Sequence, residues 1–223
     1  LLASPHSTVE ELWLAKQLVH ALGSSNIDYR LRHAEFVAAP QGQARWLGLP
    51  IAELSLLDRA LVVGSNLRKD HPLFAQRIRQ AVRQGSAQVC ALTDVAPDWA
   101  MPLHAVLQAD ALDWTRALAA IAAAVAAEKG GPLPAVEGEL NGANTSASGW
   151  AQPNAQAQAI AHALLTGKQA AILLGNAAAH HPQASSLLAL AQWVAEQTGA
   201  RFGYLTEAAN TVGAQCVGAV PQA

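Results

Sequence analysis

The stretch Ala60-Leu61-Val62-Val63-Gly64-Ser65-Asn66 decides the predicted fold, because it recurs later as Ala171-Ile172-Leu173-Leu174-Gly175-Asn176. Each copy begins as a continuous apolar run, which is typical of a β-strand buried on both faces, and ends in a glycine turn. A His-Pro pair then opens a helical pattern in both places, at His71-Pro72 and at His181-Pro182. Two similar β-α-β units of this kind predict an α/β fold with a doubly wound, mostly parallel sheet.

The two units also end alike, in Leu92-Thr93-Asp94 and in Leu205-Thr206-Glu207. Right-handed crossovers place both glycine turns at the same edge of the sheet, where they frame a common cleft. Because the chain starts at Leu1 and its only methionine is Met101, we expect a fragment of a larger subunit. The predicted organisation is a first unit over residues 1–129 with a helix at 8–22 and an irregular insert at 24–58, a linker or loop at 130–153, and a second unit at 154–223.

Composition narrows the class of function. Only 13% of the residues are charged and the formal net charge is −2, so no basic stripe is present to bind nucleic acid. The longest alanine-rich run, residues 117–127, is too short to span a membrane. Two separated cysteines, Cys90 and Cys216, form neither a disulfide framework nor a cluster site and favour a reducing, cytosolic setting. The low charge and six tryptophans indicate either a surface that another polypeptide covers or an excess of alanine, and both interpretations stay open.

The turn Gly64-Ser65-Asn66 has two interpretations. A strand end followed by a helix start gathers free backbone N–H groups, which suits a phosphate, and Arg68 and Lys69 would add positive charge. Alternatively, Gly64 only permits a tight turn and Asn66 forms hydrogen bonds within it. The turn matches neither a dinucleotide-binding fingerprint nor a P-loop, so the sequence leaves both interpretations open.

The paired histidines also have two interpretations. His71 and His181 occupy equivalent positions, which invites a metal site, but no Glu or Cys lies at ligand spacing. His180 and His181 are adjacent, so their side chains diverge. A role at the start of the helix is therefore favoured over metal binding. No Ser-His-Asp arrangement or nucleophile elbow is present, so the sequence predicts neither a metal site nor a catalytic residue.

Two stretches carry a family resemblance: Gly23-Ser24-Ser25-Asn26-Ile27-Asp28, and Val63-Gly64-Ser65-Asn66 with its continuation Leu67-Arg68-Lys69-Asp70-His71-Pro72. Both resemble the molybdopterin oxidoreductases, a family that includes formate dehydrogenases and nitrate reductases. The second is most similar to one branch of that family, the large iron–sulfur subunit of bacterial NADH:quinone oxidoreductase (complex I, a respiratory-chain NADH dehydrogenase). The resemblance implies vestigial cofactor-binding residues at Gly64, Ser65, Asn66, Asp70, His71, Gly175 and Asn176.

Departures from the family pattern matter for function. In active members Asn-x-Asp is followed by the Cys, selenocysteine or Ser that ligates molybdenum, whereas Ala34 stands at about that place here. The family's Asp-Pro-Arg after the second strand is also missing, since Asp94 is followed by Val95 and Ala96. The resemblance therefore implies a domain without a cofactor of its own, the iron–sulfur clusters lying in an amino-terminal part of the parent subunit.

As the main hypothesis, the chain is a non-catalytic scaffold in the hydrophilic arm of NADH:quinone oxidoreductase. It would be cytoplasmic, peripheral to the inner membrane without inserting in it, and bound to other subunits of that arm. A second hypothesis is a nucleotide- or pterin-binding domain of a molybdopterin-dependent oxidoreductase. A third is an active enzyme, of that family or of another doubly wound class such as the thiamine-diphosphate enzymes, with a pocket that joins Asn66, His71 and Asp94.

Overall fold

The computed structural model describes residues 1–30, 32, 35, 44–133 and 152–220. Ala34, and with it the expected place of a molybdenum ligand, lies outside these residues, as do positions 134–151 of the predicted linker. Among the described residues, no helix is long and apolar enough to cross a membrane.

A five-stranded sheet forms the centre of the molecule, and all its strands are parallel. The strand order is β3-β2-β1-β4-β5. Both predicted units therefore contribute to one sheet, and the predicted α/β class with a parallel, doubly wound sheet is confirmed. The strands are β1 (Arg59–Val63), β2 (Gln88–Thr93), β3 (Ala105–Gln108), β4 (Ala170–Leu174) and β5 (Arg201–Tyr204). The sequence pattern did not predict β3, a four-residue edge strand that pairs only with β2.

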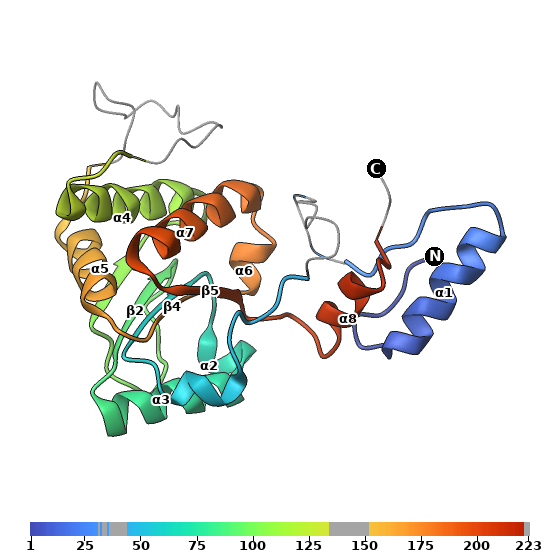
Figure 1. The fold of residues 1–223 in the computed structure, drawn as a ribbon, viewed down its shortest axis with the longest axis horizontal. Coiled ribbons are helices and arrows are strands. Elements are labelled where there is room, and N and C mark those ends of the chain that lie inside the picture. Colours follow the sequence, from blue (N-terminus) through green and yellow to red (C-terminus); the bar gives the residue numbers. More distant parts are fainter. Residues whose placement is uncertain (31, 33–34, 36–43, 134–151, 221–223) are drawn as a thin grey trace.

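Alternating side chains of the central strands enter two different cores. Leu61, Val63 and Ile172 pack on one face, under α4 (Trp114–Lys129), α5 (Ala155–Thr166) and α7 (Ala184–Thr198). Val62 and Leu173 pack on the other face, against α3 (Pro72–Gly85) and η1 (Ile51–Ser55). Figure 1 shows these two helical layers above and below the sheet. The strands are apolar throughout because both faces are covered, as their unbroken apolar runs predict.

The alanine-rich run of α4 lies inside the molecule. Residues 118–126 are all buried, between the sheet and helices α5 and α7. Small side chains let the helices approach closely, so the excess of alanine in the sequence has a packing explanation.

A small lobe lies beside the α/β body and is made of residues 1–30 and 208–220 (Figure 1). Its helices are α1 (Val9–Ala21) and α8 (Thr211–Cys216), and Leu12, Ile27 and Ala214 form its own apolar core. The two ends of the chain meet here because each alone is too short to bury an apolar face.

Helix α1 agrees with the predicted helix at 8–22. Its capping box is Thr8 with Glu11: the Thr8 hydroxyl accepts the Glu11 N–H at 3.2 Å, and the Glu11 carboxylate accepts the Thr8 N–H at 2.8 Å. The large apolar residues of this helix are divided between the core and the surface. Leu12 and Val19 are buried, whereas Leu14, Leu18 and Leu22 are exposed, because the small lobe offers only a narrow surface to the helix. Together with Val9, Trp13, Leu1 and Leu2, these exposed leucines make up seven of the fourteen exposed large apolar side chains among the described residues.

Candidate functional site

The carboxyl edge of the sheet, between β1 and β4, is where a doubly wound fold usually binds its ligand, because the strand order reverses there. Both glycine turns lie at this point, as predicted, but they pack against each other. The Gly175 N–H donates to the Val63 carbonyl at 2.8 Å, and the Ala177 N–H donates to the Gly64 carbonyl at 3.0 Å.

Steric contacts explain why both positions are glycine. A Cβ on Gly175 would lie 2.3 Å from the Cβ of Ser65, and a Cβ on Gly64 would lie 2.7 Å from the backbone nitrogen of Ala178. Gly64 also has a φ of +62°, which side chains disfavour. The geometry therefore favours the structural interpretation of these glycines: they allow two turns to touch.

Asp70 lies at the end of the short helix α2 (Leu67–Asp70) that follows the first turn. Its Oδ2 accepts the backbone N–H of Asn66 at 2.9 Å and faces the Ser65 hydroxyl, which donates to it at 3.4 Å. Three of the predicted cofactor residues are thus hydrogen-bonded to one another.

The two predicted histidines perform equivalent structural tasks. The Nε2 of His71 lies 2.9 Å from the Thr206 carbonyl, and the Nε2 of His181 lies 2.9 Å from the Ala111 carbonyl. A carbonyl only accepts, so Nε2 carries the proton in both rings. Both side chains are buried, and each stacks on an aromatic ring, Phe74 or Trp114.

The Nδ1 atoms distinguish His71 from His181. The Nδ1 of His181 accepts the Gln183 N–H at 2.9 Å, whereas the Nδ1 of His71 is buried without a partner in the described part of the chain. Each histidine fastens the start of a helix to a distant segment, in keeping with the favoured sequence interpretation. Within the described ranges, no group of three or more His, Cys, Asp or Glu side chains is placed to hold a metal ion.

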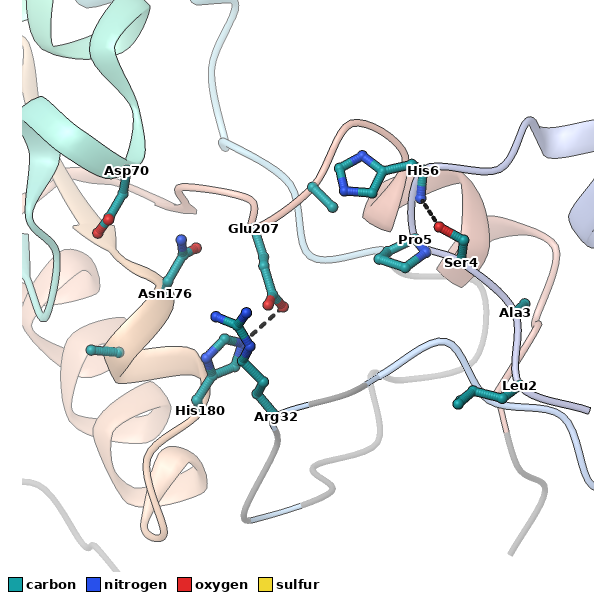
Figure 2. Close-up of a pocket in the computed structure, with 12 residues that line it drawn as sticks. Leu2, Ala3, Ser4, Pro5, His6, Arg32, Asp70, Asn176, His180 and Glu207 are labelled. Carbon is teal, nitrogen blue, oxygen red and sulfur yellow. Dashed lines mark hydrogen bonds and ion pairs between the residues drawn. The ribbon is translucent and has the colours of Figure 1, made fainter.

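A cavity of about 710 Å³ separates the carboxyl edge from the first residues of the chain (Figure 2). Asp70 and Asn176 face it from the α/β body, and Glu207 faces it from the segment after β5. The Glu207 carboxylate accepts a hydrogen bond from His180, with 2.8 Å between Oε2 and Nε2. The Oδ1 of Asn176 is buried and has no partner among the described groups. The complete lining is Leu2, Ala3, Ser4, Pro5, His6, Arg32, Asp70, Asn176, Ala177, His180, Glu207 and Ala208.

The sequence patterns predicted only part of this lining. Of the seven predicted cofactor residues, Asp70 and Asn176 line the cavity; Gly64, Ser65, Asn66, His71 and Gly175 lie in or behind the packed turns. The enzyme hypothesis would require a pocket that joins Asn66, His71 and Asp94. None of these three residues lines the cavity. Glu207 was missed as a site residue, although its position after the last strand, equivalent to Asp94, was a usable signal.

In the family-like stretch Asn26-Ile27-Asp28, the side chain of Asp28 bonds to the residues that follow it in the chain. The Asp28 carboxylate accepts the backbone N–H groups of Tyr29 and Arg30 and pairs with the Arg30 guanidinium at 2.8 Å. Burial alone would raise the pKa of Asp28, but the hydrogen bonds and charge of Arg30, with the Tyr29 N–H, lower that pKa overall.

Glu35, next to the expected metal-ligand position, caps helix α7. Its carboxylate accepts the Ser185 backbone N–H at 2.8 Å and also the Ser185 hydroxyl. Ser185 lies in the first turn of α7, where free N–H groups favour an anion. The contact between Glu35 and Ser185 joins the insert at 24–58 to the second unit.

The two turns offer only part of their N–H groups to a phosphate. Those of Asn66, Gly175 and Ala177 already donate to the chain itself. The carboxylates of Asp70 and Glu207 also face the adjoining cavity and would repel a phosphate.

Comparisons with known proteins agree with the fold. No curated protein matches the chain. Among solved structures, a chain of the formyltransferase/hydrolase complex FhcABCD from Methylorubrum extorquens, in complex with methylofuran, is similar with a TM-score of 0.57 and 23% identity over 92% of this chain. Our chain spans about half, 52%, of that chain's length. The family model of the molybdopterin oxidoreductases matches residues 1–100, so the resemblance seen in the sequence is supported over that part of the chain.

Proposed function

We propose that this chain is a non-catalytic scaffold domain of a multi-subunit complex. One observation carries the proposal: three polar side chains at the carboxyl edge of the sheet bind the chain's own backbone. His71 is bonded to Thr206, His181 to Ala111, and Asp70 to Asn66. In a catalytic domain of this fold, such side chains face the ligand instead.

Exposed apolar side chains support a partner subunit. Trp13, Leu14, Leu18 and Leu22 are each at least half exposed on or directly after α1. A concentration of this kind on one helix favours an interaction surface over scattered exposure. We propose that another subunit of the complex covers this face.

Two kinds of complex are candidates. The first is an assembly of the formyltransferase/hydrolase type, and it is supported by the similar chain in FhcABCD, which aligns with 92% of this chain. We place it first because the match extends over both predicted units and the small lobe.

The second candidate is the hydrophilic arm of NADH:quinone oxidoreductase. It is supported by the stretch Leu67-Arg68-Lys69-Asp70-His71-Pro72, which resembles the large iron–sulfur subunit of that enzyme. The chain would then be cytoplasmic and peripheral to the inner membrane, and its partners would be other subunits of the arm.

An affinity tag on the protein in its native host tests both the role and the complex. We expect co-purified subunits from one of the two complexes, and less than stoichiometric molybdenum or tungsten in this subunit by mass spectrometry. Formyltransferase subunits would favour the first candidate, and NADH dehydrogenase subunits the second. Stoichiometric molybdenum or tungsten bound to this chain would overturn the scaffold proposal.

A matched pair of variants tests the α1 surface. Leu18→Glu adds a charge to the exposed apolar face, and Gln17→Glu adds the same charge to the neighbouring polar position. We expect Leu18→Glu to reduce recovery of partner subunits while Gln17→Glu leaves it unchanged. Equal recovery with both variants would contradict a partner on this face.

A further inference from the structure

We infer that Asp70 is an internal anion that occupies the place of a ligand phosphate at the Gly64-Ser65-Asn66 turn. This role of Asp70 is independent of which complex contains the chain. The hydrogen bonds of Asp70 also hold the turn in its shape.

The contacts of Asp70 are those that a phosphate oxygen would make. A strand-to-helix turn binds phosphate through backbone N–H groups and a nearby hydroxyl. Here the Asn66 N–H donates to Asp70 Oδ2 at 2.9 Å, and the Ser65 hydroxyl donates to the same oxygen at 3.4 Å. The carboxylate therefore gains charge-assisted bonds that an incoming phosphate would have to displace.

The N–H groups of the neighbouring turn are partly used in the same way. The N–H groups of Gly175 and Ala177 donate to the Val63 and Gly64 carbonyls. The space between the turns is too small even for a methyl group, because a Cβ on Gly175 would lie 2.5 Å from the Gly64 carbonyl oxygen. A phosphate does not fit between them.

The two carboxylates at the cavity also oppose the binding of a phosphate. A phosphate in the 710 Å³ cavity would face the carboxylates of Asp70 and Glu207. Of the nearby basic side chains, Arg68 pairs with Asp98 at 2.7 Å, and His180 pairs with Glu207 at 2.8 Å. Arg32 lies beside Glu207 and His180 at the cavity, and His6 lines it from the first residues of the chain (Figure 2).

A simple helix cap would explain the same two hydrogen bonds, so the test needs a readout that capping does not change. That readout is a response to phosphate. If Asp70 replaces a ligand anion, removing its carboxylate should make the protein respond to added phosphate, whereas a cap alone predicts lower stability and no such response.

The experiment compares the full chain with Asp70→Asn, Asp70→Ala and the control Asp110→Ala. Asp110 is an exposed carboxylate that follows β3 and lies outside the cavity lining. Melting temperature is measured in chloride and in inorganic pyrophosphate at matched ionic strength, and calorimetry measures binding of pyrophosphate and of GDP. Asp70→Asn keeps the size of the side chain and guards against a failure of Asp70→Ala to fold.

We expect no binding of millimolar pyrophosphate or GDP by the unchanged protein or by Asp110→Ala. Pyrophosphate should raise the melting temperature of the Asp70 variants by about 2 °C or more relative to chloride. Binding of pyrophosphate by the unchanged protein at millimolar concentrations would overturn the inference. So would Asp70 variants that respond no more than Asp110→Ala.

Discussion

Gly64→Ala tests most directly whether the two turns are packed together. The new Cβ would lie 2.7 Å from the Ala178 nitrogen and 2.7 Å from the Trp114 ring, neither of which is free to move, since both are buried. Such overpacking costs about 1–3 kcal/mol. The φ of +62° adds about 1–2 kcal/mol for an alanine. The stiffer unfolded chain offsets about 0.4–1 kcal/mol, so we expect a net loss of about 1–5 kcal/mol in the free energy of unfolding.

Two further glycines separate the steric cost from the backbone cost. Gly199 has a φ of +72° and nothing within 4 Å of its Cβ position, so Gly199→Ala carries only the backbone cost. Gly175 has a negative φ and severe contacts, so Gly175→Ala carries only the steric cost. Urea unfolding, followed by far-ultraviolet circular dichroism, gives the midpoint for each variant. If Gly64→Ala unfolds at the same midpoint as Gly199→Ala, the turns are not in contact and the reasoning is refuted.

Three other predictions concern separate parts of the chain. Cys216 is exposed, whereas burial raises the pKa of the Cys90 thiol to about 12, so a thiol reagent at neutral pH should label only Cys216 until the protein unfolds. Asp28 has a pKa below its ordinary value in the folded state, so its contribution to stability is present above about pH 4 and is lost as the pH falls through the folded pKa; Asp28→Asn should therefore be less stable at neutral pH and show a weaker loss in acid. Ser86 ends α3 with a φ of +56°, so Ser86→Gly should raise the free energy of unfolding by about 0.5–1 kcal/mol, measured by urea unfolding.

Each of these has a clear contrary outcome. Labelling of both thiols in the native protein would show that Cys90 is accessible. Parallel pH profiles for Asp28→Asn and the unchanged protein would show that this carboxylate does not link folding to pH. A lower urea midpoint for Ser86→Gly would mean that the serine side chain contributes more than its backbone conformation costs.

The sequence predicted the sheet well because its signal is local. The runs at 60–63 and 170–174 are short unbroken apolar segments, a pattern typical of a strand covered on both faces. The glycine turns, the helix that Pro72 opens and the role of the histidines at the start of a helix follow from short stretches in the same way. Strand β3 was missed because a run of four residues at a sheet edge is too short to stand out.

The candidate site was predicted only in part, because its residues come from distant segments. Asp70 and Asn176 follow buried strands and could be found by that rule. Ser4, Arg32 and Glu207 reach the cavity only because the first and last residues of the chain meet in the small lobe. Nothing in the local sequence of any one of them indicates the other two.

By itself, the sequence determined the parallel α/β fold, the two similar units and the resemblance of the first hundred residues to molybdopterin oxidoreductases. Only the tertiary structure decided what the glycine turns do. The same Gly64-Ser65-Asn66 could either bind a phosphate or pack against its counterpart, since both uses need a small residue and a tight turn. The choice depends on what lies opposite, and here it is Gly175 at the end of the neighbouring strand β4 and the carboxylate of Asp70. A contact between turns so far apart in the sequence depends on the register of β1 with β4, which no local pattern contains.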